Sequence, residues 1–122
     1  MLYGKMFDCT FDYLDMDRII LRIKVLKDQV SYISYTNDIV DNPFVNKSRV
    51  TVNDVLHLLE SRCFPRERVN ARELIKAGGL SFYEPYAIVR KTHGIQMEDT
   101  YWIRFAGEEL KWEDVKHLRN RV

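Results

Sequence analysis

The first third of the chain alternates between apolar and polar side chains, and this period of two predicts β-strands. Residues 3–13, 18–26 and 29–36 each alternate in this way, although Ile20 and Leu26 interrupt the polar side of the second run. Short polar turns separate the three runs. We therefore expect an antiparallel meander of three strands at the start of the chain.

The second half of the chain changes to helical spacing. Thr51 is placed to cap a helix, and Asp54 three residues later suits its positive end. Pro43 argues against a helix in the polar segment before it, residues 37–50, where an apolar pair at 44–45 would anchor the loop to the core. The expected elements are helices from Thr51 to near Arg62, over residues 67–77, from Pro85 to Gly94 and over residues 110–119, and a late strand over residues 101–105.

This order of elements predicts an α+β fold, in which an N-terminal three-stranded antiparallel meander is followed by three or four short helices and one late strand. The length of 122 residues fits one domain, residues 1–122. Hydrophobic residues make up 46% of the chain, which is enough for a real core.

The overall charge excludes two classes of protein that have strongly unbalanced charge. The formal net charge is +1, so the chain is neither a strongly basic nucleic-acid binder nor an acidic mimic of DNA. Two cysteines do not make a disulfide framework. Acidic residues interrupt the start of the chain, and no stretch approaches the roughly 20 apolar residues of a membrane span. We expect a cytoplasmic protein that does not enter a membrane.

The residues that could carry chemistry do not form a recognisable set. The three histidines, His57, His93 and His117, fall on different predicted elements and have no partner at metal-ligand spacing. The glycine pair 78–79 lacks the residues of a phosphate loop. Structural or surface roles are favoured for the histidines, and a dyad of Cys63 with one of them is the alternative. We expect no enzyme activity, no cofactor and no metal.

A cluster of basic residues is the most suggestive local feature. Three of its members lie four residues apart, so they share one face of the second predicted helix. Such a face can bind an acidic protein surface or a phosphate backbone, and it can equally be an ordinary solvated face. The cluster consists of Arg62, Arg66, Arg68, Arg72 and Lys76.

Aromatic residues are dense in the C-terminal half, and most are expected in the core. One or two exposed members would make an interaction hot spot, because Trp, Tyr and Arg dominate such spots. Tyr101 and Trp102 are the candidates for partner contact.

Residues 62–105 resemble a segment found ahead of the kinase portion in HipA-like proteins of Firmicutes. The kinase motifs of that family are absent, so the resemblance implies an accessory or N-terminal module without kinase activity. It also implies a free-standing protein of a prophage or conjugative element. The matching elements are Arg62, Pro65, Arg68, Gly79-Leu80, Ile88, Gly94, Asp99, Tyr101 and Trp102.

Together these observations predict a small non-catalytic binding module that binds and modulates a host or cognate protein. An inhibitor of a host defence system, of the anti-CRISPR kind, is one example that the resemblance suggests. The alternative is a nucleic-acid-binding regulator that uses the basic helix face at residues 62–76.

Overall fold

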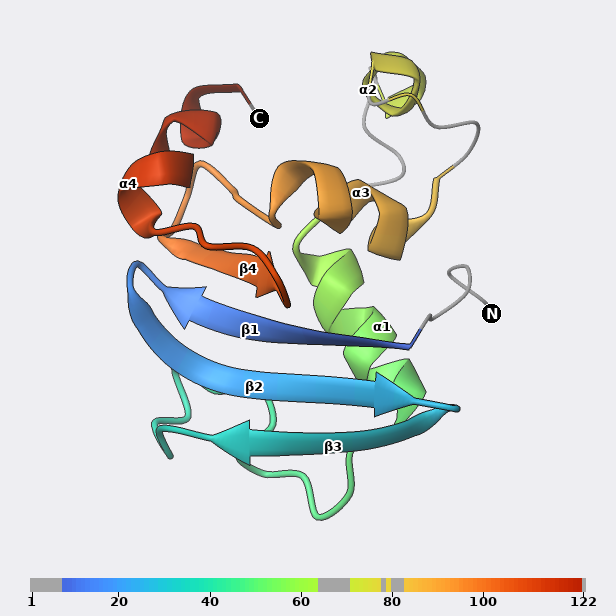
Figure 1. The fold of residues 1–122 in the computed structure, drawn as a ribbon, viewed down its shortest axis with the longest axis vertical. Helices are drawn as coiled ribbons and strands as arrows, with labels where there is room; N and C mark the ends of the chain where they lie inside the picture. The colour runs from blue at the N-terminus through green and yellow to red at the C-terminus, as the bar shows by residue number, and fades with distance from the viewer. Residues whose placement is uncertain (1–7, 64–70, 78, 80–82, 122) are drawn as a thin grey trace.

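Four antiparallel strands form one sheet in the order β3-β2-β1-β4 (Figure 1). The computed structural model describes residues 8–63, 71–77, 79 and 83–121. The expected α+β fold with its meander is confirmed, and the late strand joins the meander beside β1. The strands are β1 (Cys9–Asp15), β2 (Arg18–Leu26), β3 (Gln29–Ser34) and β4 (Tyr101–Phe105).

The helices follow the predicted order. Thr51 caps α1 through a capping box with Asp54, as expected. The described part of the predicted second helix, residues 71–77, is helical, and its residues 67–70 lie outside the described residues. The predicted last helix begins at Trp112 and continues from Lys116 as a 3-10 helix. None of the described helices is long and apolar enough to cross a membrane. The helices are α1 (Val52–Ser61), α2 (Ala71–Ala77), α3 (Pro85–Thr92), α4 (Trp112–Val115) and the 3-10 helix η1 (Lys116–Arg121).

The turns of the meander are tight. Lys27 and Asp28 both have positive φ, 49° and 63°, which is the type I′ geometry that matches the twist of a two-residue hairpin. Asp15, which the sequence placed in the first turn, instead belongs to β1 and pairs with both Arg18 and Tyr101. The strand therefore runs further than its pattern predicted.

A β-bulge explains why Ile20 interrupts the alternation of β2. Tyr13 pairs with Leu21 and Leu14 pairs with Ile19, so Ile20 is an extra residue on its strand. Ile20 is fully buried in the same core as Leu21. The bulge thus turns an apolar residue away from the polar side of the sheet.

One face of the sheet carries the main core. In Figure 1 helix α1 lies behind the sheet, and its apolar side packs there together with α3. Phe44 is buried in this core and anchors the long loop, as expected. A smaller cluster lies on the opposite face, where α4 covers one end of β1 and β4; it consists of Leu14, Ile95, Trp102, Trp112 and Val115. No helix of the described residues lies over the rest of that face, which we call the open face.

Leu59 provides a test of the core. Its side chain is fully buried on α1, so Leu59→Ala should lower the free energy of unfolding by about 2–5 kcal/mol. Leu26→Ala, at an exposed leucine, is the control and should change it by less than about 0.5 kcal/mol. Urea denaturation measures both. A loss below about 1 kcal/mol at Leu59 would contradict this packing of α1.

Candidate binding surface

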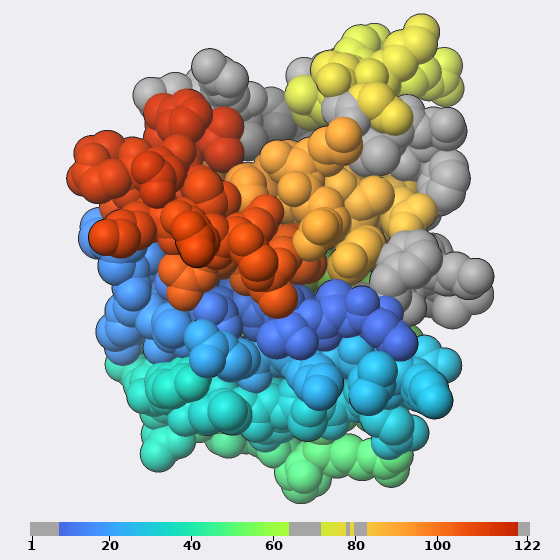
Figure 2. Space-filling model, in the orientation of Figure 1, coloured from blue at the N-terminus to red at the C-terminus, as the bar shows by residue number. Residues whose placement is uncertain are grey.

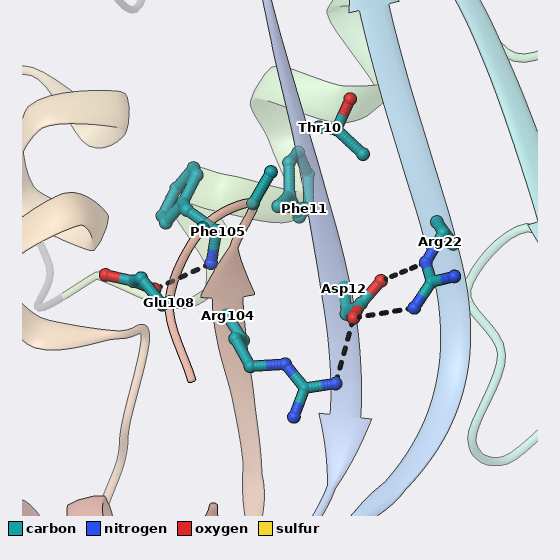
Figure 3. Close-up of a pocket in the computed structure, with 9 residues that line it drawn as sticks. Thr10, Phe11, Asp12, Arg22, Arg104, Phe105 and Glu108 are labelled. Carbon is teal, nitrogen blue, oxygen red and sulfur yellow. Dashed lines mark hydrogen bonds and ion pairs between the residues drawn. The ribbon is translucent and has the colours of Figure 1, made fainter. Parts of the chain in front are cut away.

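A row of side chains crosses the open face from one edge of the sheet to the other. Arg104 on β4, Asp12 on β1, Arg22 on β2 and Ile33 on β3 are successive neighbours in the strand register. Arg22 Nε donates to Asp12 Oδ1 at 2.7 Å, and Arg104 Nη2 donates to Asp12 Oδ2 at 3.0 Å (Figure 3). One carboxylate thereby joins three strands, of which β4 lies far along the chain from β1 and β2.

The Asp12 carboxylate is nearly buried between its two arginines. Burial raises its pKa, but the hydrogen bonds from Arg22 and Arg104 outweigh burial and hold that pKa below its usual range. The carboxylate is therefore ionised at neutral pH. It fixes the orientation of Arg22, whose side chain is still 44% exposed. The result is a positioned guanidinium on an open surface.

A shallow hollow of about 410 Å³ lies beside Asp12, between the strands and the connection that follows β4 (Figure 3). The Phe105 backbone N–H donates to Glu108 Oε1 at 2.7 Å, which shapes one wall. Two acidic and two basic side chains line it, so the hollow is not an anion site. Its lining residues are Thr10, Phe11, Asp12, Arg22, Arg104, Phe105, Ala106, Gly107 and Glu108.

Apolar side chains extend the row beyond Arg22. Ile33 and Tyr35 are 54% and 51% exposed, and Tyr35 lies near enough to Arg22 to interact with its charge. Figure 2 looks onto this face, where the β1, β2 and β3 region lies uncovered below the C-terminal segments. Arginine and tyrosine, two of the residue types that dominate interaction hot spots, therefore lie beside isoleucine on this surface.

Arg62, predicted as a partner contact, is buried instead. Its side chain is only 6% exposed, because the end of α1 packs against the segment that leads into β4. Nη1 and Nη2 each donate to the Asp99 carboxylate at 2.8 Å, Nε donates to the Gly94 carbonyl oxygen, and Nη2 also donates to that of Tyr101. The guanidinium is thus used inside the fold and is not available at the surface.

The two aromatic candidates are also used internally. Trp102 is fully buried, and its indole N–H donates to the Met16 carbonyl oxygen at 2.6 Å. Tyr101 is partly buried, stacks on Tyr13, and its hydroxyl donates a hydrogen bond to the Asp41 carboxylate. This hydrogen bond, together with burial, raises the pKa of Tyr101. Trp102 is therefore not a surface contact, and the Tyr101 hydroxyl holds the loop after β3 in place.

The remaining basic candidates are partly described. Arg72 and Lys76 are exposed on α2 and are four residues apart, so they share one side of that helix. Arg66 and Arg68 lie outside the described residues. The basic helix face remains a prediction, without Arg62 as a member.

Cys63 and His93, the candidates for catalysis, both make hydrogen-bond contacts within the fold. Burial raises the pKa of Cys63 to about 12, and its Sγ donates to the Leu59 carbonyl oxygen. Its thiol is therefore protonated. His93 ends α3 in a left-handed conformation, and its Nδ1 lies 3.2 Å from the Ile103 carbonyl oxygen. Among the described residues, no group of three or more His, Cys, Asp or Glu side chains could hold a metal ion.

Comparison with known proteins adds no relative: no family model, no curated protein and no solved structure matches the chain. The resemblance of residues 62–105 to HipA-like proteins therefore stays a prediction.

The row on the open face was missed by sequence reasoning. Asp12 lies on the polar parity of its strand, and Arg22 on the polar parity of the next, which marked both as exposed residues of an amphipathic sheet. Only the register, which sets Arg104 beside them from 92 positions away, shows that they form a network. The charge alternation along β2 is the one signal that pointed to this face.

The buried ion pair can be tested by removing its cation. Arg62→Met should lower the free energy of unfolding by about 3–5 kcal/mol, because Asp99 then keeps a partly buried charge without its partner. The matched control is Arg72→Met on exposed α2, with an expected change below about 0.5 kcal/mol. Equal stability of the two variants in urea denaturation would show that the pair is dispensable.

Acid should weaken the fold through Asp12. The pKa of Asp12 is lowered in the folded protein, so its contribution is fully present above the unfolded value of about 4 and is lost as pH falls through the folded pKa. Asp99 has the same direction of shift and adds to the effect. We expect Asp12→Asn to flatten the fall in unfolding free energy below about pH 4. Denaturation at several pH values gives the comparison.

Proposed function

We propose that this protein is a non-catalytic binding module that holds a protein partner on the open face of its sheet. The observation that supports the proposal is the juxtaposition of Arg22, Ile33 and Tyr35 on a face that none of the described helices covers. Asp12 holds Arg22 in place before any partner arrives. Less side-chain freedom is then lost on binding, which favours affinity.

The charge balance of this surface favours a protein over a nucleic acid. Asp12 lies between Arg22 and Arg104, so the row has little net positive charge to attract phosphates. The apolar Ile33 and Tyr35 supply the area that a protein contact buries. The adjoining hollow has room for a side chain from the partner.

Binding is also favoured over catalysis. The thiol of Cys63 is protonated and buried, and the hollow beside Asp12 is shallow. From the resemblance to HipA-like accessory segments, we propose a host or cognate protein as the partner, for which an inhibitor of a defence system is the example.

A nucleic-acid-binding regulator is the second candidate function. It is favoured by the exposure of both Arg72 and Lys76 on one side of α2. In that case the contact surface would be α2, and the open face would have no part in it.

The experiment compares two pairs of substitutions against a partner recovered from a Firmicutes lysate with and without nuclease. Ile33→Thr with Tyr35→Ala should weaken binding of that partner at least tenfold, which corresponds to about 1.4 kcal/mol, with little change in melting temperature. Met97→Ala, an exposed apolar residue elsewhere, is the control.

A second pair of substitutions tests the basic helix face in the same binding measurement. Arg72→Glu with Lys76→Glu should leave the affinity within about twofold if the open face binds the partner. The nucleic-acid function replaces the proposal if nuclease treatment removes the partner and only the Arg72→Glu, Lys76→Glu variant binds it more weakly. Unchanged binding of the Ile33/Tyr35 pair would remove the open face from the mechanism.

A further inference from the structure

The two most exposed large apolar side chains of the described residues are neighbours in the loop that follows β3 (Figure 1). Ile39 is 65% exposed and Val40 is 82% exposed, whereas the other exposed large apolar residues lie between 37% and 54%. Single exposed apolar residues are ordinary on a protein surface. An adjacent pair that the fold leaves in water is a candidate contact, and we call residues 36–42 the apolar loop.

Hydrogen bonds around Asp38 fix the backbone of the apolar loop. The Asp38 N–H donates to Thr36 Oγ1 at 3.2 Å, and the Val40 N–H donates to Asp38 Oδ1 at 2.9 Å. The Asn42 N–H donates to the Asp38 carbonyl oxygen at 2.9 Å. Short polar side chains that bond the backbone two residues away are typical of well-formed turns. Ile39 and Val40 therefore lie within a closed turn.

A buried asparagine ties this turn to β3. Asn42 is only 1% exposed, and its Nδ2 donates to Ser34 Oγ at 3.0 Å and to the Thr36 carbonyl oxygen at 2.8 Å. Its Oδ1 accepts from the Phe44 N–H at 2.8 Å. Both N–H groups and the oxygen of the buried side-chain amide are thus bonded, as burial requires.

Asp41 ties the same loop to two further strands. It accepts a hydrogen bond from the Tyr101 hydroxyl on β4 and another, at 2.6 Å, from Arg18 Nη2 on β2. These hydrogen bonds, that of Tyr101 first, hold the pKa of Asp41 below its usual range, so the carboxylate is ionised at neutral pH. The apolar pair is therefore held out from the body of the fold by contacts to three strands.

The charges beside the apolar pair are mainly negative. Asp38 and Asp41 flank the pair in the sequence, and residues 36–42 contain no cation. Arg18 forms an ion pair with Asp41 and lies 3.7 Å from the carboxylate of Asp15. Three carboxylates against one guanidinium leave the border of the apolar pair net negative.

This combination favours a protein as the partner of the loop. An anionic lipid surface or a phosphate backbone would be repelled by the carboxylates. The loop also has no aromatic or basic residue of the kind that holds a protein at a membrane surface. A concave apolar site on a protein can accept two short aliphatic side chains, and cations at its border would complement Asp38.

We propose that residues 36–42 are a preformed recognition loop, whose Ile39 and Val40 enter an apolar pocket of a protein partner bordered by lysine or arginine. The hydrogen bonds fix the backbone before binding, and β-branched side chains have few rotamers to lose, so little conformational entropy is lost. The inference goes beyond the proposed function and does not depend on it, because the loop contains none of the residues assigned to the open face.

Photo-crosslinking tests what the loop contacts. The probe is the full chain with Val40→p-benzoylphenylalanine, irradiated in a Firmicutes lysate, and the same substitution at Met97, another exposed apolar residue, is the control. Position 40 should give a protein adduct that position 97 does not give. The partner peptide in that adduct should contain apolar residues together with Lys or Arg. Absence of such an adduct, an acidic partner peptide, or an adduct with a second copy of this chain would overturn the proposal.

Affinity for the crosslinked partner tests the apolar pair. Ile39→Ser with Val40→Ser should weaken binding at least tenfold, because a few buried side chains carry most of the binding energy. The melting temperature should not change, since both side chains are exposed in the free chain. Met97→Ser is the matched control and should stay within about twofold of wild type. Wild-type affinity of the double variant would remove the apolar pair from the contact.

The charge of Asp38 can be removed without opening the turn. Asp38→Asn keeps the oxygen that accepts from the Val40 N–H, so the loop retains its shape. It should weaken binding about threefold at low salt and leave it unchanged at high salt, where the attraction is screened. Asp28→Asn, in the turn before β3, is the matched control and should have no effect. Equal affinity of Asp38→Asn and wild type at low salt would contradict a basic border on the partner.

Tyr101→Phe tests whether the loop is preformed. It removes the hydroxyl that bonds Asp41 and keeps the ring that stacks on Tyr13. In the folded variant the Val40 and Asn42 amides should exchange with solvent faster than in wild type. Binding should also weaken, although the apolar pair is unchanged, because more freedom is then lost on binding. Wild-type affinity of this variant would contradict the preformed loop.

Two comparisons separate the loop from the alternatives. The chain should not sediment with vesicles of phosphatidylcholine and phosphatidylserine, and sedimentation that the Ile39/Val40 double variant abolishes would replace the protein pocket with a membrane surface. If the Ile33/Tyr35 pair of substitutions weakens binding and the Ile39/Val40 pair does not, the open face stands and the recognition loop falls. The reverse result removes the open face and supports the loop.

Discussion

The buried guanidinium of Arg62 is the interaction on which the arrangement of helices and sheet depends. It extends from the end of α1 and donates to the Gly94 carbonyl oxygen, the Asp99 carboxylate and the Tyr101 carbonyl oxygen. These acceptors belong to the segment that brings the chain from α3 into β4. A buried charge is tolerated only when it is paired and hydrogen-bonded, so the segment must keep this path.

Glycine at position 94 is part of the same constraint. Its φ is +65°, and a Cβ there would lie 3.0 Å from the Cβ of Arg62. Close approach of the backbone therefore places the carbonyl oxygen where Nε can reach it. Once β4 is held in this way, Arg104 lies beside Asp12, and the row on the open face is complete. The Arg62–Asp99 ion pair thus positions Arg104 for its ion pair with Asp12 on the open face.

The strands and helices follow from local pattern to a large extent. Alternation marked the meander, and the Thr51–Asp54 capping box marked the start of α1, because both depend on residues close in sequence. The bulge at Ile20 was visible as an interruption in the pattern but could not be interpreted, since a bulge is defined by the opposing strand. The row on this surface could not be predicted as a whole, because Arg104 on β4 is 92 positions from Asp12 and reaches it only through the pairing of β1 with β4.

The sequence alone determined the fold class, the order of the elements and the absence of a recognisable catalytic motif. Each depends on short-range spacing or on residue type. Tertiary structure decided which charged residues are exposed. Arg62 and Arg72 are the same residue type within one predicted cluster, yet Arg62 is buried on Asp99 and Arg72 faces solvent. The difference arises because Asp99, 37 positions away, is brought to the end of α1 by packing, and no local pattern records that approach.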